Sequence, residues 1–400
     1  MKIQSVEAAW LHCPLSAAQQ HVSDFGRLKA FDAVLVTVTT ECGLVGYGEA
    51  KPAVGSSGNG AALVSIVCEE LRPLLLGQDP RAISHLWGCM YNGTRAGHAS
   101  RSGRAMPVLG RRGVHVAAMS GVDLALWDLT AKARSCTVLE LVGGACRERV
   151  RAYASGGWAS AESIGEELGG YAEHGFAAFK MRVGAMDGTV ARSLKRVRAA
   201  RSAIGEDADL MCDAHGTWNV AEAKRFCSGA EELSLRFVEE PIASDDRVGL
   251  AEVRRGSSLP IAAGESEFTA FDFQELLGAR AVDVLQPDLA IAGGFSEGLR
   301  IAALVYANRL ELAPHCWGSA ISFQAARTLA FASPAGVLVE LPMGGAPLLR
   351  EMAQVDLQLH EGYLKPPTGL GFGVVPDTEF VRRYTVPHGG QAAASSRVNS

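Results

Sequence analysis

The sequence predicts an α/β protein whose larger part is a closed parallel (β/α) barrel. Short apolar runs recur at intervals of roughly 22 to 32 residues, the length of one strand, one helix and their turns. Several runs end in a carboxylate or a histidine, and parallel barrels carry their chemistry at the carboxyl ends of the strands. Eight such units in series, without strand-only runs between them, indicate closure into a barrel. The expected strands are 149–154, 176–182, 208–213, 236–240, 260–265, 282–286, 310–314 and 336–340.

The residues that precede the barrel predict an α+β segment. Strands are expected over 3–11, 33–40 and 44–49, and the last two form a hairpin because a short glycine-containing turn joins two β-branched runs. Apolar residues at helical spacing predict helices over 61–76 and 114–133.

Two polar stretches have weak patterns: 14–32 is expected to be a loop, and 88–112 is expected to be a loop region with helical pieces. The first is too long for a plain turn, so it is either a functional flap or disordered. We expect both loops to determine which substrate length and stereochemistry the protein accepts. The tail 388–400, rich in Gly, Ala and Ser, is expected to be disordered.

Composition and charge exclude several classes of function. The net charge is −5, so the chain lacks the excess of positive charge that binding to nucleic acid or to an anionic membrane requires. No apolar run approaches the roughly 18 residues of a membrane-spanning helix, and the N-terminus lacks the apolar core of a signal peptide. Nine cysteines are scattered without a Cys-x-x-Cys pair, which is typical of reduced thiols. We therefore expect a cytoplasmic protein without nucleic-acid or membrane partners.

Three acids end three consecutive predicted strands. Asp213, Glu239 and Glu265 follow one another at equal spacing, one strand-and-helix unit apart. Because the carboxyl ends of parallel strands meet at one end of a barrel, the three carboxylates are expected to converge. Hard divalent cations such as Mg²⁺ prefer such oxygen ligands. The alternative interpretation is three unrelated surface acids at strand ends.

Further polar side chains lie on the second and third predicted strands. Alternation along a strand directs Lys180 and Arg182 the same way, into the barrel mouth. The same alternation places His215 on one face with Asp213 if the third strand extends that far.

An acid and a histidine end the sixth and seventh predicted strands. Asp288 follows Glu265, and His315 follows Asp288, each again after one strand-and-helix unit. An aspartate beside a histidine indicates an oriented general base, because the carboxylate fixes the ring and supports its protonated form. Glu340 ends the eighth predicted strand.

The order of these residues resembles the mandelate racemase subgroup of the enolase superfamily. The order is Lys-x-Arg, Asp, a Glu in Glu-Glu-Pro, a Glu in Gly-Glu, an Asp in Pro-Asp, and His. Segments 43–49 and 123–128 also resemble that family, so the resemblance covers most of the chain. It implies a modified (β/α)7β barrel of the TIM type over 131–344. It also implies an α+β capping domain built from 1–130 and from 345–387, which returns to it.

The resemblance further implies a chemistry on a small-molecule carboxylate. The implied ligands of one Mg²⁺ per subunit are Asp213, Glu239 and Glu265. A His315–Asp288 pair would abstract the proton α to the carboxylate, giving an enediolate. By position, Lys180 would neutralise the substrate carboxylate and Glu340 would hydrogen-bond the developing oxyanion. A homo-oligomer, from dimer to octamer, is expected.

One departure from the racemase pattern bears on the reaction. The racemase carries a second lysine where this chain has Arg182. Arginine stays protonated to about pH 12, so it is a poor second base and is better suited to clamp a carboxylate or hydroxyls. Similar acid-sugar dehydratases carry the same Asp-x-His as this chain has at His215. We therefore expect a sugar-acid dehydratase that forms a 2-keto-3-deoxy acid. His315 would take the α-proton, and His215, or His315 itself, would protonate the departing hydroxyl.

Other interpretations stay open at this point. His215 is structural if its ring only covers the metal site or bonds a neighbouring strand, and Arg182 is structural if it only pairs with a metal-ligand carboxylate. The nearest rival reaction is racemisation or epimerisation of a 2-hydroxy acid or amino acid. A cycloisomerase acting on an unsaturated diacid accords less well with His315 and Asp288. A barrel that has lost catalysis and keeps a binding role is the rival from another class.

Overall fold

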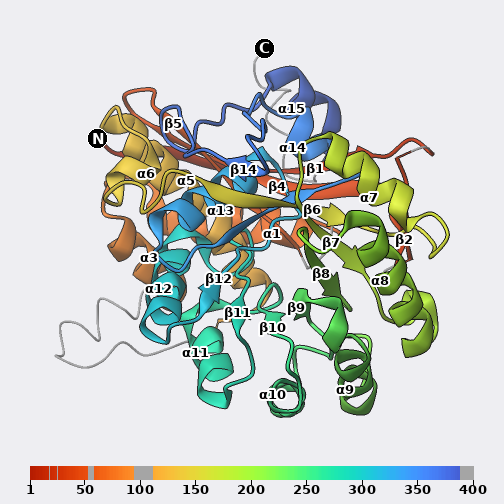
Figure 1. Cartoon of the computed structure of the whole chain (residues 1–400). Coiled ribbons are helices and arrows are strands. Elements are labelled where there is room, and N and C mark those ends of the chain that lie inside the picture. Colours follow the sequence, from red (N-terminus) through yellow and green to blue (C-terminus); the bar gives the residue numbers. More distant parts are fainter. Residues whose placement is uncertain (18, 25, 53–57, 94–110, 388–400) are drawn as a thin grey trace.

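The computed structural model describes most of the chain, and Figure 1 shows its course. The predicted tail 388–400 and most of the predicted loop 88–112 lie outside the described residues. The described ranges are 1–17, 19–24, 26–52, 58–93 and 111–387.

The N-terminal segment forms a three-stranded antiparallel sheet with the order β1-β4-β5. Its strands are β1 (Ile3–Pro14), β4 (Ala30–Thr40) and β5 (Val45–Ala50). The β4–β5 pair is the predicted hairpin. Between β1 and β4, the predicted loop contains the two-residue strands β2 (Val22–Ser23) and β3 (Gly26–Arg27), which pair with each other.

The long helix α5 (Val114–Ala133) packs across this sheet and has the predicted bounds. The approach of the two elements is close at two glycines of β5. A Cβ on Gly48 would lie 1.9 Å from the carbonyl oxygen of Gly121, and one on Gly46 would lie 2.2 Å from that of Ala125. Only glycine at both positions lets the strand backbone touch the helix backbone.

The predicted helix over 61–76 is observed as three joined pieces. These are α1 (Ala61–Ser65), the π-helical turn η1 (Ile66–Leu71) and α2 (Arg72–Leu75). Pro73 cannot donate the backbone hydrogen bond of a regular helix and its ring would clash with the preceding turn, so the helix widens before it. The next helix, α3 (Ile83–Asn92), includes the first residues of the stretch from residue 88 that was expected to be a loop region with helical pieces.

Eight parallel strands in chain order form the barrel, which confirms the predicted fold class. Each of the first seven is followed by a helix, and these helices lie along the outside of the strands (Figure 1). The ring closes where the N–H of Leu312 donates to the oxygen of Ala335 at 2.9 Å. The strands are β6 (Val150–Gly156), β7 (Ala178–Arg182), β8 (Asp209–Asp213), β9 (Leu235–Glu239), β10 (Ile261–Ala263), β11 (Val284–Leu285), β12 (Glu311–Leu312) and β13 (Leu338–Pro342). The helices are α7 (Ile164–Glu173), α8 (Val190–Ile204), α9 (Val220–Gly229), α10 (Arg247–Arg255), α11 (Thr269–Ala279), α12 (Gly294–Ala307) and α13 (Ala320–Ala332).

Alternate residues of the strands fill the barrel interior. Each strand sends one side chain of this layer inward, because successive side chains of a strand point to opposite faces. The layer is therefore a packed core that supports the strand ends above it. Its members are Tyr153, Ala178, Met211, Phe237, Ala262, Val284, Ala313 and Leu338.

The C-terminal segment contacts both the barrel and the N-terminal elements. After α14 (Pro347–Arg350), β14 (Tyr363–Leu364) pairs antiparallel with β6, and α15 (Thr378–Tyr384) follows. The N–H of Phe372 donates to Asp128 of α5 at 2.9 Å, and that of Val386 donates to the oxygen of Trp10 in β1 at 2.8 Å. Among the described helices, none combines the length and the apolar character needed to cross a membrane.

Candidate active site and metal centre

The three predicted metal ligands meet at the carboxyl ends of neighbouring barrel strands. Asp213 ends β8, Glu239 ends β9, and Glu265 follows β10 by two residues. One carboxylate oxygen from each acid lies within 4.8 Å of the others, and all three side chains are buried. Oxygen donors of this number and charge suit a hard divalent cation, so the acids form a divalent-metal site.

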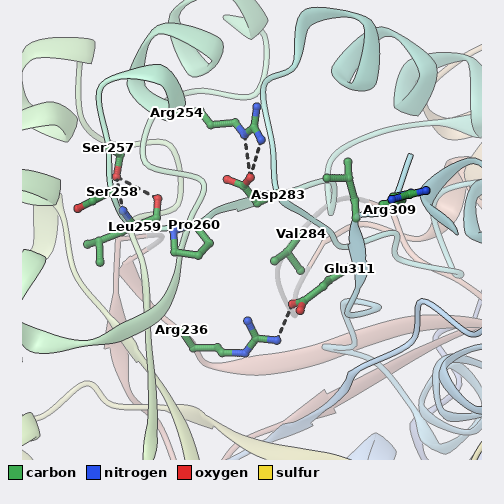
Figure 2. Close-up of a pocket in the computed structure, with 11 residues that line it drawn as sticks. Arg236, Arg254, Ser257, Ser258, Leu259, Pro260, Asp283, Val284, Arg309 and Glu311 are labelled. Atoms are coloured by element: carbon green, nitrogen blue, oxygen red, sulfur yellow. Dashed lines mark hydrogen bonds and ion pairs between the residues drawn. The ribbon is translucent and has the colours of Figure 1, made fainter. Parts of the chain in front are cut away.

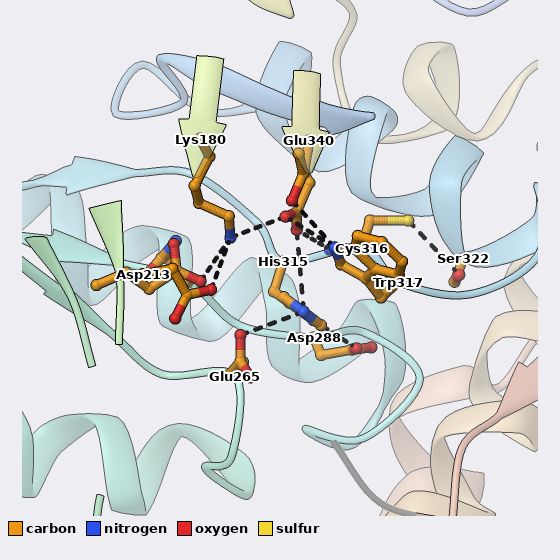
Figure 3. A network of polar contacts seen from close by, with 12 residues as sticks. Lys180, Asp213, Glu265, Asp288, His315, Cys316, Trp317, Ser322 and Glu340 are labelled. Carbon is orange, nitrogen blue, oxygen red and sulfur yellow. Dashed lines mark hydrogen bonds and ion pairs between the residues drawn. The ribbon is translucent and has the colours of Figure 1, made fainter. Parts of the chain in front are cut away.

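Lys180 of β7 lies among these acids. Its Nζ is 2.6 Å from Glu239 and 2.8 Å from Glu340 (Figure 3). A third carboxylate, that of Asp213, is 3.5 Å away. Burial lowers the pKa of Lys180, but the charges of Glu239 and Glu340 outweigh burial and hold the pKa well above its usual value. Lys180 is therefore a cation beside the metal ligands.

Arg182, two residues further along β7, pairs with a metal ligand. Its Nη1 donates to Asp213, and its Nη2 is 3.4 Å from Ser155 Oγ. The guanidinium also lies over the ring of Trp317, 5.4 Å from the ring centre. The ion pair between Arg182 and a metal-ligand carboxylate, which is the structural role that the sequence allowed, is thus present in the structure.

His315 lies between an acid of the metal site and the predicted partner Asp288. Its Nδ1 is 2.9 Å from Asp288 Oδ2, and its Nε2 is 3.2 Å from Glu265 Oε2 (Figure 3). A carboxylate only accepts, so Nδ1 carries the proton of that bond and Nε2 is the atom that faces the metal ligands. Burial lowers the pKa of His315, but Glu265, Glu340 and the bond to Asp288 together raise it above its usual value.

His215 follows β8 in a turn and has a left-handed backbone, with φ 45°. Its N–H donates to Asp213 Oδ1 at 2.9 Å, and its Nε2 is 3.4 Å from Asp213 Oδ2. Its Nδ1 is 3.2 Å from Asp24, a residue of the loop between β1 and β4. Burial, then the charge of Arg182, lowers the pKa of His215 to about 4. The structure therefore gives this histidine a carboxylate partner, as it does His315.

Glu340 of β13 joins several of these groups. It accepts from the N–H of Cys316 at 2.8 Å and from Trp317 Nε1 at 3.2 Å, in addition to its ion pair with Lys180. Burial raises the pKa of Glu340, but Lys180 and His315 outweigh burial and hold the pKa far below its usual value. Glu340 is a carboxylate that accepts in this arrangement.

Sequence reasoning missed the residues that the N-terminal segment contributes to this site. Lys51, just after β5, donates to Asp288 Oδ2 at 2.8 Å, and Asp24 meets His215. His21 stacks on Trp158, with ring centres 3.9 Å apart. Trp158 follows β6 by two residues, so its place at a strand end was a usable signal. No local pattern marks Lys51, Asp24 or His21, because their partners are far away in the chain.

A cavity of about 500 Å³ opens at the other end of the barrel, where strands β9 to β12 begin. Figure 2 shows that two of its arginines, Arg254 and Arg236, each pair with an acid of the lining. Arg254 lies 2.6 Å from Asp283, and Arg236 lies 2.5 Å from Glu311. The charges of these two arginines are balanced by the acids beside them. The cavity lies at the opposite end of the barrel from the three metal-ligand acids.

Fold and site together define the class of protein. Residues 5–143 match the mandelate racemase / muconate lactonizing enzyme N-terminal domain, and residues 163–380 match the enolase C-terminal domain-like family. The chain therefore belongs to the mandelate racemase / muconate lactonizing enzyme subgroup of the enolase superfamily, as the resemblance implied.

Among characterised relatives, the chain is similar to both dehydratases and a cycloisomerase. It is 34% identical to a D-galactonate dehydratase from Verminephrobacter eiseniae over 85% of this chain and 88% of that protein. It is 31% identical to a D-galactarolactone cycloisomerase from Agrobacterium fabrum over 88% of this chain and 91% of that protein. The chain is thus an enzyme of the subgroup, whose relatives perform more than one reaction.

Solved structures show the same architecture over nearly the whole chain. A 3,6-anhydro-D-galactonate cycloisomerase from Zobellia galactanivorans superimposes with a TM-score of 0.81 at 29% identity, covering 97% of this chain and 100% of that one. A racemase from Streptomyces coelicolor with bound magnesium has a TM-score of 0.84 at 28% identity, covering 96% and 100%.

Proposed function

We propose that this protein is an Mg²⁺-dependent sugar-acid dehydratase that removes water from a polyhydroxy acid and releases a 2-keto-3-deoxy acid. The observation that carries the proposal is the pair of histidine–carboxylate couples at two places around the metal ligands. His315 with Asp288 borders Glu265, and His215 with Asp24 borders Asp213. β-Elimination needs one group to take the α-proton and one to protonate the departing hydroxyl.

The proposed base is Nε2 of His315. Because Nδ1 donates to Asp288, Nε2 is the ring nitrogen that would take the α-proton, which requires that the ring be neutral when substrate is bound. Burial raises the pKa of Asp288, but Lys51 and His315 outweigh it and lower the pKa to about 2, so a carboxylate stabilises the imidazolium that forms. His215 would then give a proton to the hydroxyl leaving the β-carbon; because its pKa is lowered to about 4, this role requires that its ring carry a proton when substrate is bound. Alternatively, His315 returns the proton that it took.

The remaining groups bind the substrate carboxylate and its developing charge. Asp213, Glu239 and Glu265 would hold one Mg²⁺ per subunit, which stabilises the negative charge of an enediolate. Lys180 would supply a cation for the substrate carboxylate. Glu340 accepts hydrogen bonds in the described structure, so its role at the oxyanion requires that it carry a proton when substrate is bound.

The walls of the site favour a hydroxylated substrate. The Nδ1 of His21 and the Nε1 of Trp158 are buried and have no hydrogen-bond partner among the described residues. Burial, then the charge of Arg182, lowers the pKa of His21 to about 4, so its ring is neutral at neutral pH. A neutral ring nitrogen and an indole N–H suit hydroxyl groups, and unpaired buried polar atoms are costly without such a partner.

The same geometry supports a second candidate, a racemase or epimerase. Two histidines at different places around the metal ligands could also serve as two bases, one for each face of the α-carbon. The D-galactonate dehydratase relatives favour elimination, and the Streptomyces coelicolor racemase shows that the fold also supports racemisation.

Incubation of the Mg²⁺-loaded enzyme with a set of sugar mono- and diacids in deuterated water tests the proposal. We expect at least one acid to yield a 2-keto-3-deoxy product. Deuterium at the α-carbon without loss of water would instead identify a racemase or epimerase. No reaction and no exchange with any acid would contradict both.

A further inference from the structure

The end of β5 inserts two buried charges of the N-terminal segment into the mouth of the barrel. Glu49 and Lys51 are each 1% exposed. Alternation along the strand sends both the same way, while Ala50 between them faces the other side. Buried charges are costly unless they are paired, so the partners of these two side chains reveal their role.

The partner of Lys51 is the carboxylate that orients the proposed base. Lys51 Nζ and His315 Nδ1 donate to the same oxygen, Asp288 Oδ2, at 2.8 and 2.9 Å. The other oxygen, Oδ1, accepts from the N–H of Ala290 at 2.8 Å. The N–H of Lys51 in turn donates to the oxygen of Ala290 at 3.1 Å. Lys51 therefore holds Asp288 and its loop through both its side chain and its backbone.

The partner of Glu49 is the helix start that follows His315. Glu49 accepts from the N–H groups of Ser319, at 3.0 Å, and Ser322, at 3.1 Å, at the N-terminus of α13. A Cβ on Gly318 would lie 2.4 Å from Glu49 Oε1, so this approach needs glycine. A carboxylate at a helix N-terminus is stabilised by the free N–H groups there. β5 thus holds both Asp288 and the segment after His315.

We propose that Lys51 is a positioning residue for catalysis: it acts through Asp288 to hold His315 in place, so the base is complete only with the N-terminal segment seated on the barrel. This inference rests on the proposed function of His315 as a base. Without the ammonium group of Lys51, the buried Asp288 carboxylate loses a charge-assisted hydrogen-bond donor. The imidazole ring of His315, which Asp288 orients, is then held less firmly.

The kinetic test compares Lys51→Met with Lys132→Met. Lys132 is a matched control, since it also bridges β5 to a buried aspartate, Asp128, at 2.6 Å but lies away from the base. Loss of an outer partner of a catalytic group typically costs about 10- to 100-fold in activity. We expect kcat of Lys51→Met to fall by about that factor with KM changed less than about threefold, and kcat of Lys132→Met to stay near wild type. If Lys51→Met does not fold, Lys51→Gln replaces it, because it keeps a donor and loses the charge.

A double variant asks whether Lys51 acts through Asp288. In an Asp288→Asn background, Lys51→Met should cost little further activity, because the group that transmits its effect is already changed. An equal loss in both backgrounds, or full kcat in folded Lys51→Met, would overturn the proposal.

A spectroscopic measurement separates this inference from the proposed function. In the Mg²⁺-loaded protein labelled with ¹⁵N-histidine, the ring signals of His315 are identified by their loss in His315→Gln. We expect Lys51→Met to shift these signals and Lys132→Met to leave them in place. Unchanged signals in Lys51→Met would refute the positioning role whatever the reaction is. If wild type acts on no acid, the proposed function fails and this measurement alone decides the role of Lys51.

Discussion

At the scale of single residues, the site contains the same combination twice. In each case, a histidine that borders a metal ligand also contacts a further carboxylate. His315 contacts Asp288, and His215 contacts Asp24. The partners come from different places: Asp288 from a barrel strand end and Asp24 from the loop between β1 and β4. The two histidines can therefore be tested separately.

Replacing each histidine by asparagine should separate the two proton transfers. His315→Asn should abolish both turnover and exchange of the α-proton with solvent, a loss of at least about 10²-fold, because it removes the base. His215→Asn should stop the loss of water and leave slow exchange. Proton exchange followed by NMR in deuterated water, with product formation measured in parallel, checks both. Equal loss of exchange in the two variants would show that His215 takes part in α-proton abstraction.

Arg182→Lys tests whether the guanidinium clamps the substrate. An ammonium cannot reproduce the planar fork of two donors, and each charge-assisted bond is worth roughly 1.5–3 kcal/mol. We expect KM for the true substrate to rise at least about tenfold, in line with the loss of one such bond. Unchanged KM, together with faster racemisation of a 3-deoxy analogue, would mean that this position acts as a base, and would favour a racemase.

At the scale of elements, the contact between β5 and α5 sets how the N-terminal sheet is built. Gly48→Ala should lower the free energy of unfolding by about 1–3 kcal/mol, because its Cβ would meet the backbone oxygen of Gly121, which cannot rotate away. Gly88→Ala is the control. Its Cβ meets nothing within 4 Å and it lies inside α3, so it should be neutral or slightly stabilising. Denaturant titration of both variants measures the difference, and an equal effect would contradict the close-contact explanation.

The junction of α5 and α12 should make stability depend on pH. Asp123 of α5 is buried and accepts from Ser296 N and Oγ at 2.8 and 2.6 Å. Burial raises its pKa from 3.8 to about 7, despite the hydrogen bonds from Ser296. Between pH 3.8 and about pH 7, Asp123 therefore carries a proton in the folded state and has lost it in the unfolded state. Stability from this group is fully present below pH 3.8 and is lost as the pH rises through about 7.

Asp123→Asn checks that dependence, because the amide keeps the shape and does not ionise. We expect wild type to lose roughly 2–4 kcal/mol of unfolding free energy from this group as the pH rises across that window, and Asp123→Asn to lose much less. Urea titrations at several pH values give the two curves. Parallel curves would show that Asp123 ionises normally in the folded protein.

At the scale of the whole molecule, metal binding should be linked to folding. The ligands come from three strands, so only the folded chain brings them together, and a ligand that binds only the folded state stabilises it by about 2.7 kcal/mol at 100 times its Kd. We expect Mg²⁺ to raise Tm and restore activity after chelation. Glu239→Gln should abolish both effects. Full activity of wild type in chelator would contradict the metal-assisted mechanism.

The sequence by itself determined the barrel and the order of its strand ends. A strand and helix repeat follows from local apolar periodicity, so Asp213, Glu239 and Glu265 could be placed at strand ends from that periodicity alone. The convergence of these acids follows from the parallel topology, because every strand of such a barrel ends at the same rim. His315 and Asp288 could be found in the same way.

Only the tertiary structure decided which residues complete the site. Lys51 and Asp288 are 237 positions apart, and Asp24 and His215 are 191 apart. No local periodicity connects such pairs, since their contact depends on how the N-terminal sheet seats on the barrel. The ion pair between Arg182 and Asp213 was likewise one of several roles that the sequence allowed. Strand ends are set by short-range patterns, whereas the partners of a buried charge are set by packing, because a charge left unpaired in the interior is costly.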